Sequence, residues 1–188
     1  MSQMMVERIG RIETCYNEKF GVPRQPGLVK LAWGRVIFDE LYRGENFIRG
    51  IDGFSHLWLI FQFHLSPPKV GKGTVRPPRL GGNERKGVFA TRSPYRPNSL
   101  GLSVVELVGV DINHPEGPVL EVRGADIVDG TPIVDVKPYV PFCDARGDAK
   151  GGFVTGEPVK MNVYWDGSSR PNCQTKSLIE ETIALDPR

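Results

Sequence analysis

Residues 100–140 read LGLSVVELVGVDINHPEGPVLEVRGADIVDGTPIVDVKPYV and contain three segments rich in Val, Ile and Leu. Short stretches with Gly, Pro, Asn or Asp separate the segments, as is typical of neighbouring strands. Asp129-Gly130 is a favoured two-residue hairpin turn, so we expect the second and third strands to pair. Strands spaced this closely predict an antiparallel barrel or a strongly curved sheet. The three segments are 100–112, 118–128 and 131–140.

The preceding part of the chain adds further strands to this sheet. We expect strands at 6–14, 34–41, 54–65 and 87–93, and a short helix at 44–52. Residues 17–29 and 66–86 are interrupted by prolines, which predicts ordered loops, and a loop as long as the second is usually functional or disordered.

The sequence divides into a barrel and a smaller extension. Residues 5–145 are expected to form a single mainly β barrel domain with short helices. Residues 146–188 would be a linker and the start of a C-terminal domain, with a strand at 159–165 and a helical tail.

The composition excludes several classes of protein. Of 188 residues, 39% are hydrophobic and 24% charged, which is typical of a globular domain. The longest apolar run, LWLIFQF at 57–63, is too short to cross a membrane, and the N-terminus lacks the pattern of a signal peptide. Three widely spaced cysteines argue for the cytoplasm and against a disulfide framework, and we expect no metal site.

Charge is distributed unevenly along the chain. Between residues 69 and 96, eight Lys and Arg side chains face a single acid, whereas acids outnumber bases between 106 and 148. A basic segment mixed with Gly and Pro is expected where a protein contacts a polyanion, although a solvated loop is the simpler alternative.

Several polar groups stand out from the β pattern. Prolines bracket Arg24-Gln25 and rigidify the stretch that holds Arg92 and Arg96, which favours side chains held in place for a ligand. Ordinary surface turns with solvated arginines are the alternative for both stretches. Turn chemistry explains Asp129 but not Asp126. His56 and His64 lie at the two ends of an apolar strand, and Lys137 and Tyr139 follow another; for each of these an ordinary structural role remains open.

Five segments together resemble a known family. VPRQPGLVK, FSHLWLIFQFH, TVRPPRLGGN, GVFATRSPYRPNSLGLSVVEL and ADIVDGTPIVDVKPYVPF are similar to the signature segments of the bacterial tRNA N6-threonylcarbamoyladenosine methyltransferases of the TsaA-like domain family. The resemblance runs from about residue 9 to residue 142. It implies a β-barrel enzyme that uses S-adenosylmethionine and acts as a homodimer. Its substrate would be the anticodon loop of tRNA(Thr), where it methylates N6 of threonylcarbamoyladenosine 37.

The resemblance also implies site residues. The cofactor contacts of the family map onto Pro23, Arg24, Gln25, His64, Leu65, Arg92, Leu102, Asp129, Gly130, Thr131 and Pro132. Loss of the N6 proton would be assisted by Asp129, Asp126 or His64, while Lys137 and Tyr139 could orient the carbamoyl or threonyl group. Basic residues would contact the tRNA backbone, namely Arg76, Arg79, Arg85, Lys86 and Arg96.

Two other functions stay open from the sequence. One is a non-catalytic RNA-binding barrel with a vestigial pocket, and the other is a methyltransferase for another nucleic acid or a small molecule. Longer family members continue into a small C-terminal domain, so we expect the chain to be truncated near residues 183–188, IALDPR.

Overall fold

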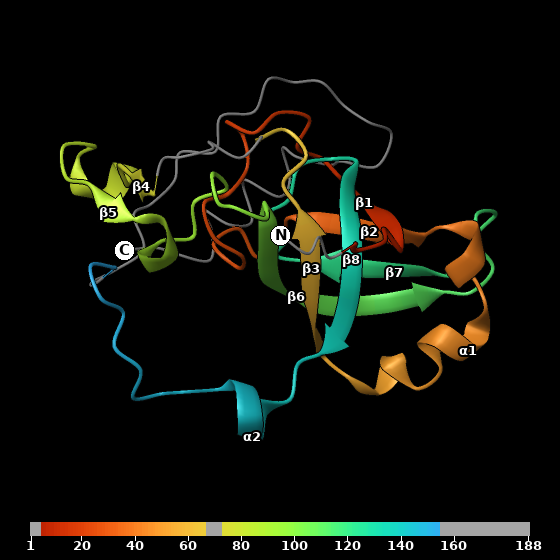
Figure 1. Cartoon of the computed structure of the whole chain (residues 1–188). Coiled ribbons are helices and arrows are strands. Elements are labelled where there is room, and N and C mark those ends of the chain that lie inside the picture. The colour runs from red at the N-terminus through yellow and green to blue at the C-terminus, as the bar shows by residue number, and fades with distance from the viewer. Residues whose placement is uncertain (1–4, 67–72, 155–188) are drawn as a thin grey trace.

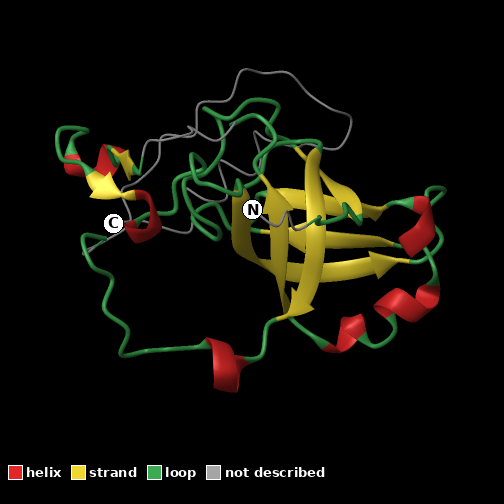
Figure 2. Ribbon diagram, in the orientation of Figure 1, coloured by secondary structure: helices red, strands yellow, loops and turns green. Residues whose placement is uncertain are grey.

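A closed antiparallel barrel of six strands forms the body of the protein (Figures 1 and 2). The computed structural model describes residues 5–66 and 73–154. Going round the barrel, the order is β1-β2-β7-β6-β3-β8. This confirms the mainly β barrel expected from the sequence. The strands are β1 (Gly10–Thr14), β2 (Trp33–Phe38), β3 (His56–Gln62), β6 (Leu100–Asp111), β7 (Val119–Arg123) and β8 (Thr131–Pro138).

The long strand β6 shows how the barrel closes. Its first half pairs with β3 from Leu100 to Glu106, and its second half pairs with β7 from Glu106 to Asp111. The register between β6 and β7 shifts between Leu107 and Gly109, and such bulges bend strands at barrel corners. β6 therefore joins the two halves of the barrel wall.

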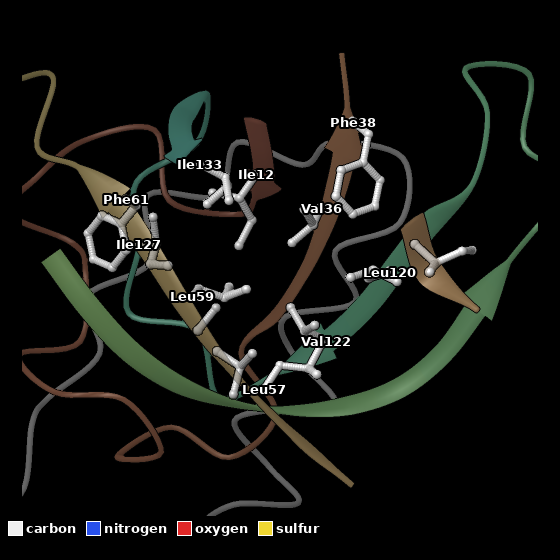
Figure 3. Packing of buried hydrophobic residues seen from close by; sticks show 13 residues of the cluster. Ile12, Val36, Phe38, Leu57, Leu59, Phe61, Leu120, Val122, Ile127 and Ile133 are labelled. Carbon is white, nitrogen blue, oxygen red and sulfur yellow. The ribbon is translucent and has the colours of Figure 1, made fainter. Parts of the chain in front are cut away.

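Alternating side chains fill the barrel interior (Figure 3). In β1 the buried positions are every second residue, and Ile12 is fully buried. Leu57, Leu59 and Phe61 of β3 repeat this pattern. The interior is thus a packed apolar core rather than a pore, as expected for a small barrel.

Short helices and one separate segment lie outside the barrel wall. The connection from β2 to β3 carries η1 (Glu40–Tyr42), α1 (Glu45–Ile48) and η2 (Ile51–Gly53). α1 lies within the range 44–52 expected to be helical, whereas η1 begins near the end of the strand expected at 34–41. A separate ribbon, hereafter the arm, spans residues 73–90 and lies to one side of the barrel in Figure 1. It contains β4 (Thr74–Val75), η3 (Pro78–Leu80), β5 (Lys86–Gly87) and η4 (Val88–Ala90), and the described chain continues past β8 into α2 (Pro141–Asp144).

The hairpin predicted at Asp129-Gly130 is wrong. β7 pairs with β2 and β6, whereas β8 pairs with β1 and β3, so the two strands are not neighbours. The chain leaves β7 at Gly124, whose φ of 76° favours glycine, and passes the ends of β2 and β1 before β8 begins. Hydrogen bonds to β1 fix the turn, because Asp129 Oδ1 accepts from Thr14 N and Gly130 N donates to Ile12 O.

The strand predicted at 87–93 is also wrong. Only its first residue belongs to the two-residue strand β5, and the chain then forms the 3-10 turn η4. The turn closes because Thr91 donates to the carbonyl of Val88 through both its N–H and its hydroxyl. Val88 is buried but Phe89 is exposed, so the apolar composition of this stretch does not reflect a barrel strand.

Some expectations lie outside the described residues. These are the strand at 159–165, the helical tail and most of the proposed 146–188 extension. In the part of the chain that is described, no helix is long and apolar enough to span a membrane.

Candidate active site

An open cleft of about 2070 Å³ lies at one end of the barrel. At this end β1, β3 and β7 finish and β2, β6 and β8 begin, so loops from distant parts of the chain meet. The lining comes chiefly from the loop before β2, the end of β3, the arm, the stretch leading into β6 and the segment before β8. These include the segments that the sequence singled out.

Asp126 and Ser103 form the acidic part of the cleft. Ser103 Oγ, on β6, donates to Asp126 Oδ1 at 2.5 Å. Burial raises the pKa of Asp126 to about 6, while the Ser103 hydrogen bond and the positive charge on Arg92 act in the opposite direction. The carboxyl group therefore titrates close to neutral pH, where a general base is most effective.

Arg92 and Gln25 form the basic part of the cleft. Arg92 Nη1 donates to Gln25 Oε1 at 2.7 Å, which joins the loop before β2 to the loop before β6. Arg24 and Pro23 line the same wall. A guanidinium held beside an amide can pair with a carboxylate, because two of its N–H groups lie in one plane.

His64, just after β3, lies against Thr131, the first residue of the neighbouring strand β8. The Thr131 hydroxyl donates to Val128 O at 2.7 Å and lies 3.3 Å from His64 Nδ1. With that proton committed to Val128, the ring donates from Nδ1 and Nε2 is the acceptor. Burial lowers the pKa of His64, and the negative charge of Asp129 only partly opposes this effect, so the ring is neutral near pH 7.

Asp129 has a structural position beside the cleft. Its carboxylate accepts from the backbone N–H of Thr14 at 2.9 Å, and its own N–H donates to Tyr16 O at 2.7 Å. Asp129, Gly130 and Pro132 are not among the lining residues, whereas Thr131 is. The predicted cofactor segment thus reaches the cleft through Thr131.

Lys137 and Tyr139 lie away from the cleft. In an extended strand, the six residues from Thr131 to Lys137 cover about 20 Å. Tyr139 packs near Trp58 with ring centroids 5.9 Å apart, and Lys137 Nζ lies 3.5 Å from Asp135 Oδ2. Within one chain, therefore, the structure does not bring this pair together with Asp126.

The predicted RNA-binding residues cluster on the arm and beside it. Arg76 and Arg85 are exposed and line the cleft mouth. Lys86 pairs with Glu84 and lies over the ring of Phe153 at 6.0 Å. Arg96 donates to Thr91 O at 3.2 Å. The side chain of Arg79 lies outside the described part of the structure.

The rest of the cleft suits a flat apolar group next to charged ones. Phe61 and Phe63 lie in an edge-to-face pair with centroids 5.2 Å apart. Leu65 and Leu102 also line the cleft and expose apolar surface. An adenine fits such walls, and the carboxylate of an amino acid end fits the Arg92 pole. The donor set therefore fits S-adenosylmethionine. Among the described residues, no cluster of His, Cys, Asp and Glu could hold a metal ion.

Two contributors to the cleft were not found from the sequence. Ser103 is one inward-facing residue of an apolar strand. It is 23 positions from Asp126 in the sequence, and only the fold brings the two side chains together. Residues 151–154 also return to the cleft, where Gly151, Phe153 and Val154 line it. No pattern in the sequence links that stretch to the barrel end.

Known proteins resemble this chain over most of its sequence. The profile of the tRNA-methyltransferase O N-terminal domain matches residues 11–145. A tRNA (adenine(37)-N6)-methyltransferase of Escherichia coli K12 is 44% identical over 100% of the chain and 83% of the relative. A putative S-adenosylmethionine-dependent methyltransferase of Pseudomonas aeruginosa is 40% identical over 97% of the chain and 81% of the relative.

A solved structure has the same fold. The crystal structure of TrmO from Pseudomonas aeruginosa aligns with a TM-score of 0.68 at 37% identity, covering 84% of this chain. The chain spans 66% of that structure's length, just under two thirds.

Proposed function

The chain belongs to the tRNA-methyltransferase O family and is an S-adenosylmethionine-dependent methyltransferase acting on N6 of adenine 37 in tRNA. We propose that the base it methylates carries a threonylcarbamoyl group, as in tRNA(Thr). The observation that supports the proposal is the pairing of an acidic and a basic pole across one cleft: Asp126 with Ser103, and Arg92 with Gln25.

We assign the removal of the N6 proton to Asp126. A nitrogen that is part of a carbamoyl linkage is a poor nucleophile, so its proton must leave as the new bond forms. Asp126 lines the cleft and titrates near pH 6, whereas Asp129 accepts a backbone hydrogen bond beside it. His64, neutral and also lining the cleft, is the second candidate.

The other cleft residues bind and orient. S-adenosylmethionine, when bound, supplies the methyl group on a sulfonium centre. Arg92 and Arg24 are suited to its carboxylate, and the apolar side chains of Leu65 and Leu102 to its adenine. Holding the reacting atoms in line contributes about 7–11 kcal/mol to such a displacement, which makes positioning the main task of the pocket.

The tRNA is proposed to approach over the arm. Four basic side chains lie at the cleft mouth or on the arm, where they suit the phosphates of an anticodon loop. They are Arg76, Arg85, Lys86 and Arg96. We keep Arg79 in this set as a prediction. A homodimer in the cytoplasm is also proposed. In that assembly Lys137 and Tyr139 could serve a site only across the subunit boundary, because they lie away from the cleft of their own chain.

Methyl transfer to matched tRNAs tests the proposal. Labelled S-adenosylmethionine is offered with tRNA(Thr) that carries the threonylcarbamoyl group and with the same tRNA lacking it. We expect label at N6 of adenosine 37 in the first alone. Equal labelling of both would overturn the modified substrate. No labelling of either, together with no heat from S-adenosylmethionine in calorimetry, would favour a non-catalytic RNA-binding barrel. Labelling of another nucleic acid or a small molecule alone would point to a different substrate class.

A further inference from the structure

Ser103 is a buried hydroxyl on a rigid strand. It pairs with Leu59 of β3 in the barrel ladder, and its side chain is 2% exposed. A buried hydroxyl is costly unless it finds a partner. Here the partner is the carboxyl group of Asp126, at 2.5 Å from Oγ to Oδ1.

Asp126 itself lies outside the strands. It belongs to the segment between β7 and β8, whose backbone is held at Ala125 by Ala32 and at Ile127 by the hydroxyl of Thr14. These contacts place the main chain but leave the direction of the carboxyl group open. Ser103 is the barrel-strand side chain that bonds to it in the described part of the structure.

We propose that Ser103 is a positioning residue for the methyl transfer, whose hydroxyl holds one oxygen of Asp126 so that the other oxygen is directed at N6 of the substrate adenine. This rests on the proposed function, in which Asp126 removes the N6 proton. A hydrogen bond to a rigid strand restricts the rotation of the Asp126 carboxyl group before the reaction. Less conformational entropy is then lost on reaching the transition state.

The electrostatics of the pair agree with this role. Burial raises the pKa of Asp126, and the Ser103 hydrogen bond lowers it. Arg92, from the loop before β6, is the charged group that also lowers it. Removing the hydroxyl leaves burial less opposed, so Asp126 would be ionised only at higher pH.

Ser103→Ala tests the inference, with Ser99→Ala as the matched control. Ser99 is also buried just before β6, and its hydroxyl has no hydrogen-bond partner in the described structure. The rate at saturating tRNA and cofactor is measured from pH 5 to 9. We expect Ser103→Ala to lose about tenfold at pH 6, as for one hydrogen bond to a charged group, and to keep a loss of more than about twofold at pH 9, where Asp126 is ionised but no longer held. Ser99→Ala should follow the wild type.

A second readout does not depend on turnover. The carboxyl carbon of Asp126 is titrated by NMR in the free protein, and its midpoint should move to higher pH in Ser103→Ala but not in Ser99→Ala. An unmoved midpoint would overturn the inference alone, even with methyl transfer intact. If Asp126→Asn kept full activity, the assignment of Asp126 as the general base would be wrong, and so would the positioning role of Ser103.

Discussion

Arg92 and Arg96 lie four residues apart but have different environments. Arg92 is bonded to Gln25 across the cleft and acts electrostatically on Asp126. Arg96 is bonded to the backbone of its own loop at Thr91. The first side chain belongs to the basic pole of the cleft, whereas the second is held by its own loop. Their roles should therefore separate in experiment.

Single substitutions check this separation. Arg92→Ala should weaken cofactor binding in calorimetry by about tenfold to a hundredfold, because it removes both the proposed charge-assisted hydrogen bond to the cofactor carboxylate and the link to Gln25. Arg96→Ala should leave cofactor binding within about threefold and raise the KM for tRNA, as expected for a rim charge. Equal effects of the two substitutions on cofactor affinity would show that the division is wrong.

At the level of elements, sequence patterns predicted the positions of the strands better than they predicted which strands pair with each other. The buried alternation around Ile12 and Leu59 predicts strands correctly, because a barrel wall has one apolar face. The hairpin prediction at Asp129-Gly130 failed, because the same two residues suit a hairpin or a crossing anchored to β1. Likewise, the loop residues Arg24, Gln25 and Arg92 could be named in advance, whereas the contact of Ser103 with Asp126 depends on long-range closure.

The arm allows a test that involves an element rather than one group. Replacing Arg76 and Arg85 together by Gln should lower the affinity for tRNA and flatten its dependence on salt. The log–log slope should fall by roughly 0.7–0.9 for each phosphate that the variant no longer neutralises. Cofactor binding measured by calorimetry should stay unchanged.

The control for the arm is a charge-matched pair elsewhere. Arg8 and Arg49 lie at the other end of the barrel, where they bond to Asp39 and Asn46. Replacing both by Gln removes the same net charge. An equal loss of salt dependence in this variant would show that overall charge, and not the arm, attracts the tRNA.

Across the whole molecule, the buried carboxylate of Asp126 in the cleft lowers the free energy of unfolding at neutral pH. Asp126 has a folded-state pKa of about 6 against an ordinary value of 3.8. The folded state therefore binds the proton more tightly than the unfolded state, and the contribution of this group to stability is lost as pH rises from about 4 to above 6. A partly buried carboxylate suited to act as a base thus opposes folding at neutral pH.

Asp126→Asn should accordingly stabilise the protein while removing its activity. The free energy of unfolding at pH 7.5 should rise, with about 3 kcal/mol as the upper bound for a shift of roughly two pKa units. At pH 4 the difference should vanish. Urea unfolding at the two pH values measures both.

Asp144→Asn is the control of opposite sign. Hydrogen bonds from the backbone of Val140 and from Trp58 lower the pKa of Asp144, so its contribution to stability is present at neutral pH and fades on acidification. A loss of stability in Asp126→Asn at pH 7.5 would contradict the assignment of a raised pKa to that residue.

The pairing of β1 with β8 has a consequence for how the protein matures. Gly10 meets Ile133 in that ladder, so the ring is closed by residues far apart along the chain. High contact order of this kind slows folding, because the entropy of a long loop is lost before its contacts form. Thr14, Tyr16 and Ile12 also anchor the segment that leads into β8. We therefore expect a nascent chain to complete the cleft and bind its methyl donor only after β8 has left the ribosome, so that the donor stabilises the finished ring.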